Sequence, residues 1–255
     1  MKTSGLKTRI LAGDRLVGTF LRTPAPEIVE ILARTGLDFI CFDAEHAPFD
    51  AARLDACMAV ARALGFPALV RVVSEEPAVI LQAMDAGAVG VVVPHVTDAD
   101  MARRVVKAAH FGHGGRGFNG GTRWAGYRSQ NFAEILEQSK RETVVLAQIE
   151  EPEGVDAADE IAAVDGIDAL FVGPADLSIA YGKTDMTSPE LMAAFESVGA
   201  ATRAHGKGFV TFVSTVEKAA EWQKFGMNVL FIASEQDWIA TGAQAAAAGI
   251  RQLDD

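Results

Sequence analysis

Strand-length apolar runs alternate with helix-length segments along almost the whole chain. The runs are rich in β-branched and aromatic residues, as buried strands are, and they occupy residues 16–21, 38–43, 68–73, 89–96, 144–150, 168–176, 208–213 and 229–233. Helical patterns lie between nearly all of them, at 26–35, 51–64, 77–86, 98–109, 153–164, 189–205 and 215–225, and a last one covers 240–253. Because parallel strands need crossover helices of this kind, the order predicts a parallel sheet.

Eight strands alternating with helices over 255 residues are typical of a (β/α)8 barrel. An open, doubly wound sheet is the alternative. The sequence contains no short-period repeat, low-complexity segment or interdomain linker. We therefore expect an α/β protein with a single TIM-barrel domain over residues 1–255.

Composition limits the partners and the compartment. Hydrophobic residues make up 49% of the chain, enough for a large core, yet no apolar run approaches the roughly 20 residues of a membrane span. The net charge of −11 argues against nucleic acid and anionic membranes as partners. Residues 1–13 lack the apolar segment of a secretion signal. Cys41 and Cys57 lie in apolar patterns and are expected to be buried thiols, so the cytoplasm is the simplest location.

Carboxylates follow two consecutive predicted strands. Glu150 ends the run 144–150, and Asp176 ends the run 168–176. Because a right-handed crossover makes such strands parallel, their C-terminal ends meet at the face where α/β proteins place their chemistry. Two nearby carboxylates repel each other unless a proton or a cation separates them. Oxygen ligands favour a hard divalent ion such as Mg²⁺ or Mn²⁺, so we expect a metal site here.

Other polar residues gather at the same strand ends. Asp43, Glu45 and His46 follow the second strand, and an adjacent carboxylate can fix the tautomer of a histidine and raise its basicity. Arg71 interrupts the apolar third strand; it either forms a structural ion pair or binds a substrate carboxylate through two hydrogen bonds. Gln148 lies two residues before the carboxylate of the fifth strand, on the same side, and can donate to a substrate oxygen or support a ligand.

Three further residues lie at element ends. Asp85 ends a helix, where it either caps that helix or forms an ion pair. His95 follows the fourth strand and is interpreted as a wall residue of the site. Phe212, near the end of the seventh strand, either packs in the core or faces the barrel mouth.

The glycine-rich stretch 111–130 interrupts the regular pattern. It lacks the Lys-Ser or Lys-Thr pair that closes a phosphate-binding loop. We expect either a flexible surface loop, or a lid or subunit contact beside the active face.

The residues that other types of catalysis require are missing from the sequence pattern. An aldolase that forms an imine needs a lysine at an inward strand position, but no predicted strand carries one within it or at its C-terminal end. Lys207 precedes the seventh strand and lies on the wrong face. The sequence also shows no Ser/His/Asp arrangement for nucleophilic catalysis and no Cys/His zinc cluster.

Five short motifs carry a family resemblance: F-D-A-E-H-A-P-F-D, L-V-R-V, G-V-V-V-P-H-V, A-Q-I-E and F-V-G-P-A-D-L-S. Their order and spacing resemble the HpcH/HpaI aldolase family, the metal-dependent 2-oxoacid aldolases, from about residue 18 to the last strand. The resemblance implies a (β/α)8 barrel assembled as a homohexamer, with C-terminal helices exchanged between subunits. The family loop motif R-G-V-G-x-x-x-A-R-A-S departs here to R-G-F-N-G-G-T-R-W-A-G-Y. The departure falls on Arg123, in a loop that would shape the acceptor pocket.

The resemblance also implies roles for individual residues. Glu150 and Asp176 would be the ligands of a divalent metal ion, Mg²⁺, Mn²⁺ or Co²⁺. The oxoacid would be held by side chains and backbone groups at the same face: Arg71, Gln148, Gly173, Pro174 and Ala175.

Proton transfer would fall to His46, paired with Asp43. Asp85 resembles the family acid that reaches the site region from a neighbouring subunit. Phe212 would line the acceptor pocket if it faces the mouth.

The implied activity is the reversible cleavage of a 4-hydroxy-2-oxoacid to pyruvate or hydroxypyruvate and an aldehyde. The metal would polarise the ketone and stabilise an enolate. Decarboxylation of oxaloacetate, which needs the same enolate without an aldehyde, is the alternative chemistry. A catalytically silent barrel that serves as a binding or assembly subunit is the alternative of another class. The joint presence of Glu150, Asp176, Arg71 and His46 argues against the silent barrel.

Overall fold

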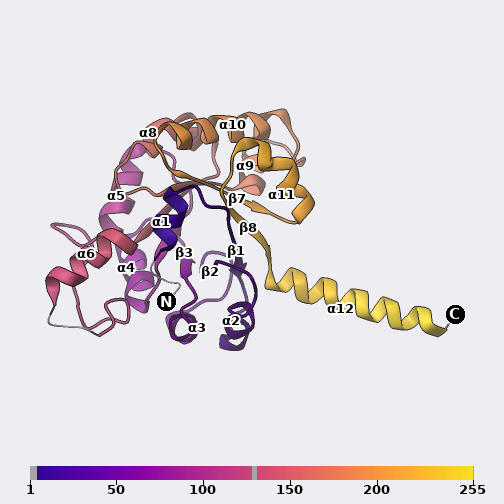
Figure 1. Ribbon diagram of the computed structural model, residues 1–255. Coiled ribbons are helices and arrows are strands. Elements are labelled where there is room, and N and C mark those ends of the chain that lie inside the picture. Colours follow the sequence, from indigo (N-terminus) through magenta and orange to yellow (C-terminus); the bar gives the residue numbers. More distant parts are fainter. Residues whose placement is uncertain (1–4, 128–130, 255) are drawn as a thin grey trace.

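The computed structural model describes residues 5–127 and 131–254. Eight parallel strands close into a barrel in chain order, with β8 paired to β1 (Figure 1). The strands are β1 (Leu16–Leu21), β2 (Phe39–Asp43), β3 (Ala68–Arg71), β4 (Gly90–Val93), β5 (Val144–Ile149), β6 (Ala169–Val172), β7 (Gly208–Val213) and β8 (Val229–Ser234). The closed barrel confirms the (β/α)8 prediction and excludes the open sheet.

Helices flank the strands. They are α1 (Leu6–Leu11), α2 (Pro26–Leu32), α3 (Ala51–Ala63), α4 (Pro77–Ala86), α5 (Ala99–Ala109), α6 (Phe132–Glu142), α7 (Pro152–Asp156), α8 (Ala158–Ala162), α9 (Pro174–Ala180), α10 (Pro189–Ala204), α11 (Val216–Trp222) and α12 (Glu235–Arg251), with 3₁₀ turns at Gln223–Phe225 and Gln252–Asp254. Several begin where a side-chain oxygen accepts a backbone N–H of the first turn, as Asp50 does for α3 and Asp98 for α5.

The helices differ from the sequence pattern in several places, and α12 begins at Glu235, five residues before the predicted start. The pattern does not predict α6, which directly follows the glycine-rich stretch and buries only Ile135 and Ser139. It also misses α9, because the apolar run predicts that Pro174 to Asp176 end a strand, whereas they form the first turn of this helix. The single helix predicted at 153–164 is divided into α7 and α8 at Ala157, whose backbone (φ −90°, ψ 6°) leaves the helical region.

The inside of the barrel is filled by alternate side chains of the strands, as the two-residue period of a strand requires. They include Leu16, Phe20, Phe39, Cys41, Leu69, Val92, Val144, Leu146, Ala169, Phe171, Val210, Val229 and Phe231. Leu6 and Ile10 of α1 join this cluster, and Ile10 packs beside Gly208 at the start of β7. Since α1 closes the N-terminal end of the barrel, the C-terminal end is left for a site.

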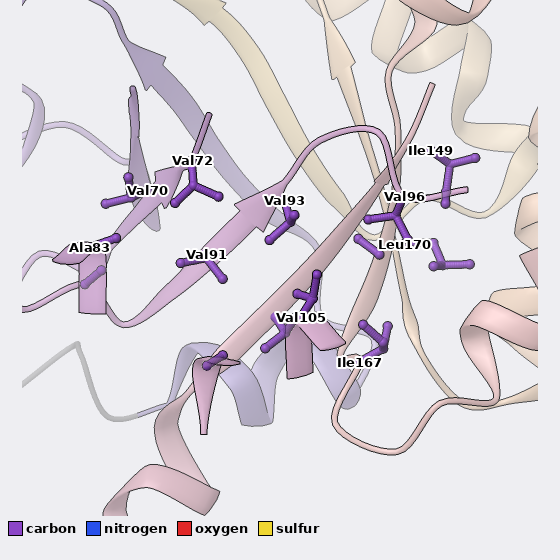
Figure 2. Close-up of a cluster of buried hydrophobic side chains, with 14 of the residues drawn as sticks. Val70, Val72, Ala83, Val91, Val93, Val96, Val105, Ile149, Ile167 and Leu170 are labelled. Carbon is purple, nitrogen blue, oxygen red and sulfur yellow. The ribbon is translucent and has the colours of Figure 1, made fainter. Parts of the chain in front are cut away.

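A second apolar layer separates the strands from the helices. Outward side chains of β3 and β4, such as Val70 and Val91, pack against Ala83 of α4 and Val105 of α5 (Figure 2). All four are almost fully buried. This layer holds the strands firmly, so side chains at the strand ends stand on a rigid support.

The described part of the glycine-rich loop, residues 111–127, is packed against the barrel's outer helices. Arg116 is buried, with its guanidinium carbon 4.4 Å from the centre of the Phe111 ring. Arg123 donates to the carbonyl of the last residue of α4 (3.0 Å). Because α4 runs opposite to the strands, this end of α4 lies at the N-terminal end of the barrel. The described loop is therefore not a lid over the C-terminal face of its own chain; residues 128–130 lie outside the described residues.

The last helix, α12, projects away from the barrel (Figure 1). Its first turn is anchored, because Ser234 and Asp237 form a capping box and the buried Glu235 accepts the backbone N–H groups of Arg22 and Thr23. The rest of α12 is exposed. Within the described residues, no helix combines the length and hydrophobicity that crossing a bilayer requires.

Candidate active site

The C-terminal end of the barrel opens into a cavity of about 260 Å³. Its lining residues are Phe20, Arg22, Asp43, His46, Arg71, Gln148, Phe171, Gly173, Pro174, Ala175, Asp176, Met186, Phe212, Ala233, Ser234 and Asp237. The alternation of side chains along a strand explains why Asp43 and Arg71 line the cavity. Cys41 of β2 and Leu69 of β3 point into the barrel, and the next inward positions on these strands are Asp43 and Arg71. The parallel register of β2 and β3 places these two residues directly opposite each other.

Asp43 and Arg71 form a buried, two-pronged ion pair. Nε of Arg71 donates to Oδ1 of Asp43 (3.0 Å), and Nη2 donates to Oδ2 (2.8 Å). Glu45 places a carboxylate oxygen 3.2 Å from the same Nε. The ring of Phe20 lies against the guanidinium, 4.3 Å from its carbon. Arginine has five N–H donors, so a substrate carboxylate does not have to displace Asp43.

Glu150 has polar neighbours on both carboxylate oxygens although it is buried. Oε1 accepts the backbone N–H of His95 (2.9 Å), and Oε2 accepts the side-chain amide of Gln148. Gly173 abuts the same group, since a Cβ there would lie 3.0 Å from Oε2. His95 has a left-handed backbone (φ 57°), and its ring Nδ1 lies 3.2 Å from Oε1.

The site has more buried negative than positive charge. Burial raises the pKa of Glu150, and the nearby carboxylate of Asp176 adds to this rise. Burial also raises the pKa of Glu45, although Arg71 opposes the change. Additional positive charge in the site would therefore stabilise the ionised form of both glutamates.

His46 and Asp176 lie in the cavity wall, in positions that differ from a simple strand-end arrangement. Asp176 belongs to the first turn of α9, not to the end of β6. The backbone N–H of His46 donates to Oδ1 of Asp43 (3.2 Å), while its half-exposed ring places Nε2 3.7 Å from Glu45. His46 is thus tied to Asp43 through its backbone, and the Asp43 carboxylate binds the guanidinium of Arg71.

Asp85 and Phe212, each of which has two interpretations from the sequence, lie in different parts of the structure. Asp85 is not among the residues that line the cavity; it forms an ion pair with Arg116 (2.5 Å), as one interpretation predicted. Phe212 lines the cavity, with its ring centre 6.4 Å from that of Phe20, and it also packs against the barrel core.

Sequence reasoning missed part of this lining. Arg22 carries a signal that was available, because it follows the inward Phe20 by two residues, as Asp43 follows Cys41. The sequence predicts His95 only as a wall residue; it is not among the residues that line the cavity, and its ring lies beside Glu150. Its left-handed backbone has no sequence signal, since residues other than glycine rarely adopt it.

The residues present fit a divalent cation. Glu150 and Asp176 offer carboxylate oxygens where positive charge is lacking. Gln148 is 2% exposed, and no described residue hydrogen-bonds its Oε1. An unpaired buried carbonyl is costly and indicates a missing partner. Glu45, His95 and Glu150 offer further ligand atoms, all within 4.8 Å of one another.

Fold and site together define a class: a (β/α)8-barrel enzyme whose acidic C-terminal face suits a metal ion and a small anionic substrate.

Comparison with known proteins narrows this class. The family model "HpcH/HpaI aldolase/citrate lyase" matches residues 16–240. A hydroxypyruvate/pyruvate aldolase of Roseovarius nubinhibens is 31% identical, over 99% of this chain and 98% of its own. A 5-keto-4-deoxy-D-glucarate aldolase of Salmonella arizonae is 28% identical over 93% of both chains. The crystal structure of a HpcH/HpaI aldolase/citrate lyase family protein from Burkholderia cenocepacia has a TM-score of 0.91 at 29% identity, covering 98% of this chain and 100% of that one.

The chain therefore belongs to the HpcH/HpaI aldolase/citrate lyase family, and it is a carbon–carbon lyase of the aldolase class. The relatives give no support to a decarboxylase or a silent barrel.

Proposed function

We propose that the protein reversibly cleaves a 4-hydroxy-2-oxoacid to pyruvate or hydroxypyruvate and an aldehyde, using a divalent cation held by Glu150 and Asp176. The observation that carries this proposal is the joint presence of Arg71, Gln148 and Asp176 in the wall of one cavity. A 2-oxoacid presents a carboxylate and a keto oxygen side by side, and these groups match a guanidinium and an acid-held cation. The relative named hydroxypyruvate/pyruvate aldolase supports this choice of donor.

Binding of the oxoacid falls to three parts of the wall. Arg71 pairs with the substrate carboxylate through donors that Asp43 does not use. Gln148 contributes its amide beside the keto group, and backbone groups from Gly173 to Ala175 close the wall. The cation, when bound, supplies a Lewis acid that polarises the ketone and stabilises the enolate.

Proton transfer falls to His46 in this proposal. During cleavage the 4-hydroxyl loses its proton while the C3–C4 bond breaks, and C3 then gains a proton. His46 lines the cavity, and its backbone is held by Asp43. A histidine suits both transfers because its ordinary pKa lies near neutrality.

Metal dependence is the first test of this function. A chelator should abolish activity, and Mg²⁺, Mn²⁺ or Co²⁺ should restore it, because the proposed protein ligands are few and leave positions open for substrate and water. Glu150→Gln and Asp176→Asn should lose activity while remaining folded, since relief of carboxylate repulsion offsets lost contacts. Asp156→Asn removes an exposed acid outside the cavity and serves as the matched control. Activity that survives chelation, together with a borohydride-trapped lysine adduct of pyruvate, contradicts the proposal.

Substrate choice needs a separate assay. A panel of 4-hydroxy-2-oxoacids, with oxaloacetate alongside, should show release of pyruvate or hydroxypyruvate from the aldols at a higher kcat/KM than decarboxylation of oxaloacetate. Faster turnover of oxaloacetate than of every aldol would make decarboxylation the main chemistry.

We also propose that the chain, as one domain over residues 1–255, forms a homohexamer in which α12 is exchanged between subunits. An apolar groove of about 270 Å³ lies on the outside of the barrel, where β1, β7, β8 and α11 supply the lining. The exposed part of α12 carries Trp238, Ile239 and Ile250, and the 3₁₀ turn after it carries the exposed Leu253. Seating this helix on a neighbouring barrel would cover both apolar surfaces. In such an assembly Asp85 would approach the site region of a neighbour.

The proposed location is the cytoplasm. Both cysteines, Cys41 and Cys57, are buried free thiols, as a reducing compartment favours. Fractionation of producing cells would test this location.

A further inference from the structure

His95 lies among three carboxylates at the mouth of the barrel. Its Nδ1 is 3.2 Å from Oε1 of Glu150 and 3.2 Å from Oε1 of Glu151, while its Nε2 is 3.7 Å from Oε1 of Glu45. A neutral imidazole carries a single N–H. One ring nitrogen therefore turns a lone pair toward a carboxylate, an unfavourable contact unless a positive charge is shared between them.

The backbone holds this ring in place. His95 follows Pro94 beyond the end of β4, and its left-handed backbone directs its N–H to Glu150. The next N–H along the chain, that of Val96, donates to the carbonyl of Gln148 in β5 (3.0 Å). Left-handed residues other than glycine are uncommon and concentrate at functional sites.

An unpaired buried oxygen in the same group of residues is a second sign of a missing ligand, separate from the position of the His95 ring. Gln148, 2% exposed, presents an Oε1 that no described residue hydrogen-bonds, although its Nε2 binds Glu150. Glu45 presents its Oε1 to the same ring, since its Oε2 is already paired with Nε of Arg71 at 3.2 Å. A divalent cation with bound water would satisfy such acceptors.

We propose that His95 supplies a nitrogen ligand to the divalent cation, next to Glu150 and Glu45, and that this ligand shifts the metal preference from Mg²⁺ toward Mn²⁺ and Co²⁺. The inference rests on the proposed function, because it requires a cation at this site. The ligand atoms of the three residues lie within 4.8 Å of one another, which a single ion can bridge. Mg²⁺ demands oxygen ligands in octahedral geometry, whereas imidazole suits later first-row metals.

Spin-echo spectroscopy of bound Mn²⁺ tests the ligand directly, without measuring activity. The wild-type protein loaded with Mn²⁺ should show ¹⁴N modulation of the electron spin echo, and labelling with [¹⁵N]histidine should change it to the ¹⁵N pattern. His95→Asn should abolish the modulation; asparagine suits this variant because it tolerates the left-handed backbone. His46→Asn, at the other histidine of the site, is the matched control and should keep the modulation.

Competition between metals gives a second readout. The electron-spin resonance signal of free Mn²⁺, followed during titration with Mg²⁺, gives the ratio of the Mn²⁺ affinity to the Mg²⁺ affinity. This ratio should fall about tenfold or more in His95→Asn. Even changes to residues outside the ligand shell cost about that much in metal affinity. Mn²⁺ that binds without ¹⁴N modulation, or modulation that survives in His95→Asn, overturns the inference and leaves the proposed metal site intact. Mn²⁺ binding without ¹⁴N modulation is the result expected if His95 is an imidazolium that only forms ion pairs with the carboxylates. Failure of the wild-type protein to bind Mn²⁺ overturns both the inference and the metal dependence of the proposed function.

Discussion

Arg71 shows how one residue combines structural and chemical roles. Its guanidinium is buried, pairs with Asp43 through two hydrogen bonds and lies against the ring of Phe20. A charge in this setting is tolerated only because it is paired. The same pairing fixes the orientation of the remaining N–H donors before a substrate arrives, and such preorganisation favours binding.

Replacing Arg71 should affect binding and stability in separable ways. Arg71→Ala should lower kcat/KM at least tenfold, because loss of a charged hydrogen bond costs about 1.5–3 kcal/mol. It should also lower the free energy of unfolding by about 3 kcal/mol, since Asp43 is left buried without its partner. Arg71→Lys keeps the charge but not the two-pronged geometry, so it should recover stability more than activity. Steady-state kinetics and urea unfolding measure both; kcat/KM at the wild-type value in a folded Arg71→Ala protein would contradict the binding role.

Phe212 should influence which aldehyde is accepted. Its half-buried ring lines the cavity beside Phe20. Phe212→Leu should change aldehyde preference or product stereochemistry, while exchange of the C3 protons of pyruvate with solvent deuterium persists. Phe195→Leu, in the apolar layer outside the barrel, is the control and should cost about 1 kcal/mol or more of stability without changing product ratios. Unchanged product ratios together with reduced stability in Phe212→Leu would assign this ring to the core alone.

At the scale of elements, α1 closes the barrel end opposite the site. Lys7 of this helix lies 3.0 Å from Oδ1 of Asp168 and donates to the carbonyl of Thr143 (3.0 Å). Asp168 is 3% exposed and also accepts the backbone N–H of Val145 (2.9 Å). This contact joins α1 to the loops that precede β5 and β6.

The contribution of Lys7 to stability should depend on pH. Burial raises the pKa of Asp168, and Lys7 opposes that rise. In Lys7→Met the pKa of Asp168 should rise further, so the variant should lose stability most where Asp168 is ionised in the wild-type protein. The difference in Tm should be largest at pH 7–8 and shrink as pH falls through the pKa of Asp168, because protonation removes the ion pair. Lys140→Met, at an exposed position on α6, is the control; a pH-independent difference for Lys7→Met would contradict the ion-pair explanation.

At the scale of the whole molecule, α12 is the part least explained by a single chain. Its first turn is anchored by the buried Glu235, but the apolar residues beyond it are exposed. The outer groove of about 270 Å³ is lined largely by β7, β8 and α11, and α12 points away from the barrel that carries this groove (Figure 1). Exposed apolar surfaces of this kind can mark sites of subunit contact.

Truncation should therefore change the assembly. A chain that ends at Asp237 keeps the capping box of Ser234 and Asp237 but loses the exposed apolar residues from Trp238 onward. Light scattering after size exclusion should give a hexamer for the full chain and smaller species for the truncated one. Leu136→Ala, which removes an exposed apolar residue of α6, is a control that should leave the hexamer intact. A full chain that is monomeric would rule out the exchange.

Much of the fold was predictable because its signals are local. β1 and β7 begin and end at the residues that the apolar runs predict, since a strand buried on both faces reads as a continuous run of β-branched and aromatic residues. α4 likewise runs from Pro77 to Ala86, where a proline starts and a glycine follows the helix. Polar residues at consecutive strand ends were also enough to locate the site, because parallel strands present their C-terminal ends on one face.

By itself, then, the sequence determined a barrel of eight strands and the face that carries Arg71, Gln148 and Glu150, since the alternation of side chains along a strand is a property of the local chain. Only the tertiary structure decided that Asp43 pairs with Arg71 and that the ring of His95 lies beside Glu150. These partners come from different strands, and their meeting depends on barrel register and on a left-handed backbone that no local pattern encodes. The direction of α12 could not be predicted for the same reason. An amphipathic sequence indicates that a helix needs an apolar partner, but it does not indicate which surface or which subunit provides that partner.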